Sequence, residues 1–177
     1  LLGNEAVRII FDGDAYIAHE GKILQQNARF SYQDVSLIGH ELSLPIREDK
    51  GEDVVVFELQ LCSEPKVVSV EIPVWESSST KKEEEFSKAV ALGLFDYLHK
   101  SRSQGWVLSL SGGADSSAIA SLCSLSIQNA IAELGWEAFK AKLDYIPLST
   151  QDRVMADLLT TIYQGTVNSS QSTRDSA

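Results

Sequence analysis

The stretch Trp106-Val107-Leu108-Ser109-Leu110-Ser111-Gly112-Gly113-Ala114-Asp115-Ser116-Ser117 decides the fold that we predict for this chain. It begins as a short apolar run with β character, turns through two glycines, and continues into an alanine-rich segment with helical spacing. A strand, a glycine turn and a helix start make an anion site, because backbone N–H groups and the positive end of the helix converge there. The sequence therefore predicts a phosphate site at residues 111–116, called the glycine loop below.

The side chains of the glycine loop suit a polyphosphate. Gly112 and Gly113 let the backbone approach an anion without a Cβ in the way, and Ser111 and Ser116 add hydroxyl donors. Asp115 repels phosphate, so its carboxylate is better explained as a ligand of a magnesium ion bound with the polyphosphate. No Gly-Lys-Ser/Thr follows the glycines, so the common P-loop of kinases and GTPases is excluded.

Composition limits the function classes. The 177 residues are 44% hydrophobic and 23% charged, which is ordinary for one large domain or parts of two. A formal net charge of -10 argues against a nucleic-acid-binding surface. Cys62 and Cys123 lack metal-ligand spacing and fit a reducing cytoplasm, and no apolar run is long enough to span a membrane. Because no initiating Met is present, we expect a fragment of a longer protein.

Helical patterns flank the strand at 106–110. Thr80-x-x-Glu83 is a capping-box pattern that predicts a helix from Thr80, ended by Gly105. After the glycine loop, apolar residues at helical spacing predict a helix that ends near Gly135, with Cys123 in the core. A short helix over 136–143, a helix over 151–159 and a strand over 160–164 follow. This order predicts a doubly wound parallel sheet that binds ligands beyond the carboxyl ends of its strands.

The N-terminal part reads as short strands. Runs at 8–11, 15–18 and 23–26, separated by turns, predict an antiparallel meander, and 35–44 shows the alternation of a further strand. Residues 54–61 and 67–75 are β-prone, but Pro65 and Pro73 limit them to an extended connector or a small hairpin. The polar run 76–79 is the predicted domain boundary.

Three stretches resemble known families. Ser111-Gly112-Gly113-x-Asp115-Ser116 resembles the pyrophosphate loop of N-type ATP pyrophosphatases, which include NAD, GMP and asparagine synthetases. Residues 11–18, 21–24 and 28–31 resemble the end of a nitrilase-type glutamine amidase domain. Residues 158–174 are similar to the second strand and following loop of glutamine-dependent NAD synthetases. Together they make the chain resemble the glutamine-dependent NAD(+) synthetases over most of its length.

The resemblance implies a fold and a domain order. It implies an α/β fold with a doubly wound parallel sheet of the adenine nucleotide alpha-hydrolase kind, preceded by antiparallel C-terminal strands of a nitrilase-like domain. Residues 1–45 would end the glutaminase domain, 46–79 would connect, and 80–177 would begin the synthetase domain. The glutamate, lysine and cysteine of the amidase would lie before Leu1, so Cys62 is not assigned their role.

The resemblance also implies a reaction. Deamido-NAD would be adenylated by ATP and amidated to NAD by glutamine-derived ammonia, with release of AMP and pyrophosphate. The implied partners are deamido-NAD, ATP with Mg²⁺, and glutamine or ammonia, in a cytoplasmic homo-oligomeric ligase without nucleic acid or membrane contacts. Ser111 is the expected catalytic residue and Asp115 the expected metal ligand. The expected ATP-binding residues are Ser109, Leu110, Ser111, Gly112, Gly113, Ala114, Asp115, Ser116, Tyr163 and Gln164.

Alternatives remain open from the sequence. One is another pyrophosphate-loop synthetase, similar to GMP or asparagine synthetase, with the same first half-reaction and a different acceptor. Another is a non-catalytic nucleotide-binding module. Tyr163 has two interpretations of equal weight, contact with the nucleotide and internal packing, because aromatic residues also favour strands.

Overall fold

The computed structural model describes residues 2–5, 9–43 and 71–175. Four short strands come first: β1 (Leu2–Glu5), β2 (Ile9–Asp12), β3 (Tyr16–His19) and β4 (Lys22–Gln26). The described elements that follow are a 3₁₀ helix η1 (Val74–Ser77), α1 (Lys81–Ser101), β5 (Trp106–Leu110), α2 (Ala114–Leu134), α3 (Trp136–Lys142), α4 (Val154–Leu158), β6 (Leu159–Tyr163) and α5 (Gln171–Asp175).

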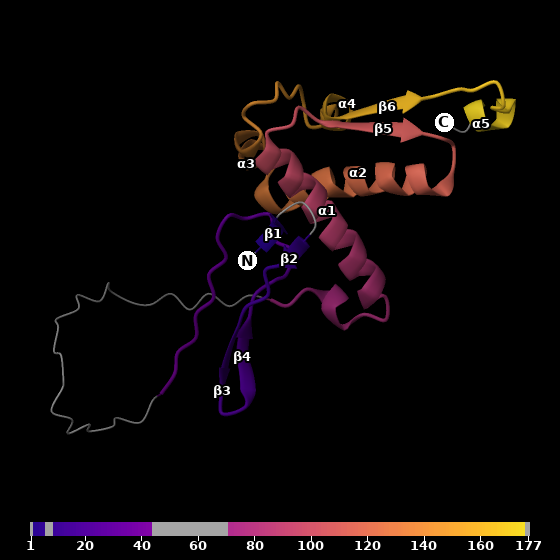
Figure 1. Ribbon diagram of the computed structural model, residues 1–177. Coiled ribbons are helices and arrows are strands. Elements are labelled where there is room, and N and C mark those ends of the chain that lie inside the picture. Colours follow the sequence, from indigo (N-terminus) through magenta and orange to yellow (C-terminus); the bar gives the residue numbers. More distant parts are fainter. Residues whose placement is uncertain (1, 6–8, 44–70, 176–177) are drawn as a thin grey trace.

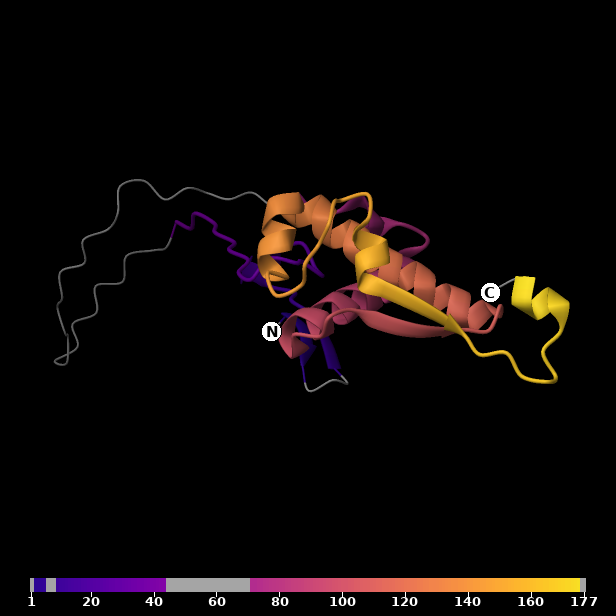
Figure 2. The same cartoon turned by 90° about the horizontal axis from the view of Figure 1, so that it is seen from above.

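Two long helices form the centre of the described structure. The 21-residue helices α1 and α2 pack against each other, and α2 runs alongside β5 and β6 (Figures 1 and 2). Cys123 is 2% exposed, which confirms its predicted place in the core. Buried apolar residues from both long helices, from α3, α4 and the preceding loop, and from the N-terminal segment make the core: Phe30, Tyr32, Leu92, Phe95, Leu98, Ile127, Ala130, Phe139, Leu143, Ile146, Val154 and Leu158.

The ends of α1 differ from the prediction. Thr80 is the N-cap, but its backbone (φ -101°, ψ 22°) is not extended and its side chain makes no capping hydrogen bond. Its hydroxyl instead lies 3.2 Å from the Ser78 hydroxyl, so the predicted capping box is wrong. The helix ends at Ser101 with Arg102 as its C-cap in the left-handed conformation (φ 54°), rather than at Gly105. Gly105 serves a different purpose, since a Cβ there would lie 2.6 Å from the Leu158 carbonyl oxygen.

The strands β5 and β6 are parallel, as predicted. Their register runs from Trp106 opposite Leu159 to Leu110 opposite Tyr163. The crossover between them contains α2, α3 and α4, which confirms the β–α–β order. The helix predicted over 151–159 is shorter, because residues 151–153 form turns before α4. The carboxyl ends of both strands and the N-terminus of α2 lie at the same end of the molecule (Figure 1).

The N-terminal strands do not form one meander. β1 pairs with β2, and β3 pairs with β4, in two separate antiparallel pairs. The buried side chain of Asn27 explains the break, because it accepts from the Ala15 N–H (2.7 Å) and donates to the Gly13 carbonyl (2.8 Å). These bonds fix the chain between β2 and β3 in a turn that directs the β3–β4 hairpin away from β2.

Other predicted segments have mixed outcomes. Residues 33–43 contain no strand, so the one predicted over 35–44 is not found in its described part. The β-prone segments 54–61 and 67–70 and Cys62 lie outside the described residues. The rest of the second segment is not a strand, because Val74 begins η1. The short helix predicted over 136–143 is confirmed as α3.

Candidate functional site

The glycine loop joins the carboxyl end of β5 to the N-terminus of α2. Gly112 has φ +72°, the left-handed region that favours glycine. Gly113 is the N-cap of α2 with an extended backbone, and a Cβ there would lie 3.2 Å from the Ser111 hydroxyl. Glycine is thus favoured at the two positions for different reasons: the backbone conformation at Gly112 and the space beside the Ser111 side chain at Gly113. Together they turn the chain from the strand into the helix within a single tight bend.

The N–H groups at this helix start are available to a ligand. The first backbone bond of α2 is donated by Ser117 to the Gly113 carbonyl at 3.2 Å. The N–H groups of Ala114, Asp115 and Ser116 precede that bond and point out of the helix end, where the helix dipole is positive. The geometry therefore provides convergent donors for an anion beyond the carboxyl end of β5.

Ser116 supports the loop from inside. It is 7% exposed, and its hydroxyl accepts from the Ser111 N–H (3.3 Å) and donates to the Gly113 carbonyl (3.2 Å). The prediction of Ser116 as a hydroxyl donor to phosphate did not include this burial. A signal was present, because Ser116 lies seven residues before Cys123 and shares the buried face of α2.

Ser111 is exposed at the mouth of the loop. Its hydroxyl accepts a hydrogen bond from the Gly113 N–H at 3.3 Å and lies 3.2 Å from the Ser116 hydroxyl. The Ser111 hydroxyl thus lies where a phosphate oxygen was predicted to accept from the Gly113 N–H. A change of the Ser111 rotamer would release that donor to a ligand.

Asp115 lies exposed in the first turn of α2, beside the loop. Within residues 2–5, 9–43 and 71–175, no three His, Cys, Asp or Glu side chains gather in a way that could hold a metal ion. Asp115 is therefore a single carboxylate next to a phosphate site. Such a carboxylate fits Mg²⁺, which keeps several waters and binds through one or two carboxylates together with substrate phosphates.

The second predicted contact region lies at the same sheet edge. Leu110 is opposite Tyr163 in the β5–β6 register, so Ser111 and Gln164 both follow strand ends that are neighbours. Ser109 and Gln164 are exposed. The Tyr163 hydroxyl is buried and has no hydrogen-bond partner among the described residues, which is uncommon for a buried polar group. The structure thus brings the predicted residues of both strands together, and it leaves both readings of Tyr163 open.

Comparisons with known proteins find similarity over the segment that contains the glycine loop. The NAD synthase family model matches residues 86–154, which include most of α1, β5, the glycine loop, α2 and α3. A crystal structure of a glutamine-dependent NAD(+) synthetase from Cytophaga hutchinsonii is 37% identical and superposes with a TM-score of 0.70 over 98% of this chain. The chain is thus similar, over nearly its whole length, to proteins named glutamine-dependent NAD(+) synthetase.

The relatives that the chain matches are much longer than this sequence. The glutamine-dependent NAD(+) synthetase of Homo sapiens is 32% identical over 97% of this chain, which spans 28% of that protein. The corresponding enzyme of Arabidopsis thaliana is 29% identical, and the chain spans 27% of it. The chain also covers 26% of the Cytophaga hutchinsonii synthetase. No helix within residues 71–175 is long and apolar enough to cross a membrane.

Proposed function

We propose that this chain supplies the ATP-binding loop of an enzyme that amidates deamido-NAD to NAD with glutamine-derived ammonia. The reaction would pass through an adenylated intermediate and release AMP and pyrophosphate. The observation that carries the proposal is the glycine loop, which lies at the carboxyl end of a parallel strand and within the segment matched by the NAD synthase model. The family match favours deamido-NAD over the acceptors of GMP and asparagine synthetases.

The bond changes define what the loop has to do. A carboxylate oxygen of the nicotinate ring substituent attacks the α-phosphorus, and the bond to the bridging oxygen breaks, so pyrophosphate leaves with the electron pair. Ammonia then attacks the acyl carbon, loses a proton, and displaces AMP. No general base is needed for the first step, because the carboxylate is already ionised at neutral pH.

The residues of the loop suit the departing pyrophosphate. Preorganised N–H groups at Gly112, Gly113 and Ala114 would stabilise the charge that develops on it. Ser111 would turn its hydroxyl from the Gly113 N–H toward the phosphate, while Ser116 keeps the loop in shape from below. Asp115 would hold Mg²⁺, whose charge neutralises polyphosphate. The nucleotide would be contacted at the same edge of the sheet by Ser109, Leu110, Tyr163 and Gln164.

The domain assignment is part of the proposal. Residues 1–45 would end a nitrilase-like domain, 46–79 would connect, and 80–177 would begin the synthetase domain with a doubly wound sheet. The parallel β5–β6 pair and the antiparallel N-terminal pairs support it. Val107 and Ile162 are 72% and 45% exposed on this sheet, whereas parallel sheets are usually covered on both faces. Cytoplasmic location and a homo-oligomeric state stay predictions.

The products of ATP cleavage test the proposal. The protein at its natural length should release AMP and pyrophosphate in equal amounts, and only when deamido-NAD is present. Formation of ADP would exclude the scheme. Binding of ATP without any turnover, with both nitrogen sources supplied, would favour a nucleotide-binding module instead.

A further inference from the structure

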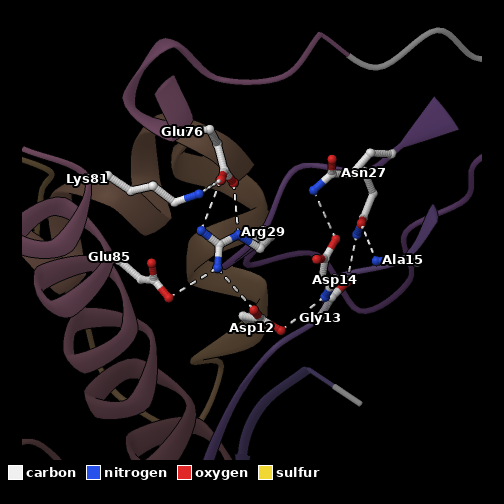
Figure 3. A network of polar contacts seen from close by, with 10 residues as sticks. Asp12, Gly13, Asp14, Ala15, Asn27, Arg29, Glu76, Lys81 and Glu85 are labelled. Carbon is white, nitrogen blue, oxygen red and sulfur yellow. Dashed lines mark hydrogen bonds and ion pairs between the residues drawn. The ribbon is translucent and has the colours of Figure 1, made fainter. Parts of the chain in front are cut away.

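A largely covered arginine side chain joins the N-terminal strands to helix α1. The Arg29 cluster consists of Asp12, Arg29, Glu76, Lys81 and Glu85 (Figure 3). Arg29 makes a forked pair with Glu76, from Nε to Oε1 and from Nη2 to Oε2, each at 2.9 Å. Its Nη1 atom donates to Asp12 and to Glu85, each at 3.2 Å. The guanidinium therefore contacts the end of β2, η1 and the first part of α1 at once.

The surroundings hold this guanidinium in one place. The side chains of Arg29 and Glu76 are 9% and 10% exposed, and the Arg29 guanidinium carbon lies 5.2 Å and 5.0 Å from the ring centres of Phe30 and Trp75. Lys81 adds a second cation 3.5 Å from Glu76. Forked, charge-assisted pairs in a shielded site are the strong ones, whereas exposed ion pairs contribute little. The cluster is thus suited to holding the N-terminal strands in a fixed position on α1.

The strands fit against α1 beyond the cluster. A Cβ at Gly93 of α1 would lie 2.6 Å from the Cδ1 atom of Ile10, and one at Gly3 would lie 2.4 Å from an oxygen of Asp96. Near the end of the helix, Asp96 accepts from the Asn4 N–H at 2.6 Å. The β1–β2 pair is therefore held at both ends of α1 and lies closely on the helix between them.

Helix α1 is connected to the glycine loop through β5 (Figure 1). Its end at Ser101 is followed by β5, and the glycine loop begins where β5 ends. α1 also packs against α2, the helix that starts at the loop, so the N-terminal strands and the loop are attached to the same pair of helices. Glu76 and Glu85 lie 47 and 56 positions after Arg29 in sequence, so no local pattern could have identified the cluster.

We propose that Arg29 is a positioning residue that fixes the N-terminal strands on α1, so that ammonia released on the glutaminase side reaches the adenylated intermediate beside the glycine loop. The proposal rests on the proposed function. It separates two properties: the synthetase reaction itself, which free ammonium can support, and the delivery of nitrogen from glutamine, which needs a fixed arrangement of the two parts.

Arg102 offers a matched control. It is also an arginine with a carboxylate and an aromatic partner, since Nη2 lies 3.6 Å from Asp144 and its guanidinium carbon lies 4.4 Å from the Tyr145 ring centre. Its side chain is 66% exposed, and both partners belong to the synthetase segment. Arg102→Met therefore removes the same chemistry without touching the N-terminal strands.

The experiment uses the protein at its natural length and measures NAD formation with glutamine and with ammonium, alongside glutamine hydrolysis. Arg29→Met should lower the ratio of glutamine-supported to ammonium-supported rates by about fivefold or more while glutamine hydrolysis continues, and Arg102→Met should leave the ratio unchanged. An equal loss of both rates in Arg29→Met, or no loss, would overturn the proposal. If Arg29→Met does not fold, Glu85→Gln, which keeps the fork with Glu76, decides by the same ratio. An unmodified protein that makes no NAD from either nitrogen source would overturn the proposed function, and this inference with it.

Discussion

The hydroxyl groups of Ser111 and Ser116 lie 3.2 Å apart across the start of α2, one exposed and the other buried. This difference separates two tasks that the sequence motif does not distinguish. The exposed hydroxyl is free to change partner when a ligand arrives. The buried hydroxyl already bonds to the loop backbone and keeps its shape.

Substitution of the two serines should separate these tasks. Ser111→Ala is expected to lower kcat/KM for NAD synthesis by about 100-fold, as for loss of one donor to developing charge, and to leave the Tm unchanged. Ser116→Ala should lower the free energy of unfolding by about 1–2 kcal/mol as well, because buried backbone groups lose their partner. Thermal unfolding and steady-state kinetics check both. Equal Tm losses in the two variants would contradict the division.

Gly112 should be irreplaceable for a conformational reason. Gly112→Ala is expected to destabilise the loop by about 1 kcal/mol because φ is +72°, and to weaken ATP binding measured by calorimetry. Gly21→Ala is the control, since Gly21 has φ +76° and nothing within 4 Å of the added Cβ. That variant should have a similar stability cost and unchanged ATP affinity. Reduced affinity in both variants would argue against a local role.

Asp115 should govern the magnesium requirement. Asp115→Asn keeps the size of the side chain and removes its charge. The Mg²⁺ concentration for half-maximal NAD synthesis should therefore rise about tenfold or more, because even the loss of an outer-sphere contact weakens metal binding by about that factor. Glutamine hydrolysis should continue at its usual rate. Asp152→Asn, an exposed carboxylate on the turn before α4, is the control. An unchanged Mg²⁺ dependence would remove Asp115 from the site.

The Arg29 cluster should make stability depend on pH. Arg29, and to a smaller extent Lys81, hold the pKa of Glu76 below its usual value. A carboxylate whose pKa is lower in the folded state stabilises that state fully when the pH is above its pKa in the unfolded chain, about 4.3. This stabilisation is lost as the pH falls through the pKa of the folded state. Glu76→Gln should therefore cost about 3 kcal/mol at pH 7 and almost nothing at the lowest pH where the protein folds. Asp12 and Glu85 also face Arg29, each with a carboxylate oxygen 3.2 Å from its Nη1 atom.

Urea unfolding of the unmodified protein and of Glu76→Gln at several pH values measures this difference. The two curves should converge as pH falls below about 4. Parallel curves over the whole range would show that Glu76 does not contribute through its charge.

Local patterns predicted the elements that carry the site. The apolar spacing of α2, the run of β5 and the β–α–β order depend on residues within one turn or one strand of each other, and the structure contains all of them. The predicted capping box fails because Ser78, outside the pattern, takes the hydroxyl of Thr80. The meander fails because Asn27 bonds back to residues 13 and 15 and redirects the chain.

The remaining features depend on contacts that are distant in sequence. Arg29 pairs with residues after position 70, and Phe30 and Tyr32 enter a core made mostly of α1, α2 and α3. The predicted boundary at 45 gives no hint that residues 29–32 pack with the helices that follow it. Only the folded chain brings these residues together.

The hydrogen bond from the Gly113 N–H to the Ser111 hydroxyl also affects which anions the loop accepts. The Gly113 N–H already has a partner in the chain, so an anion that binds there competes with a hydroxyl held at high effective concentration. A lone orthophosphate replaces one such bond and gains little. A chain of linked phosphates makes several contacts for one loss of freedom, so the loop should discriminate by valency as well as by charge.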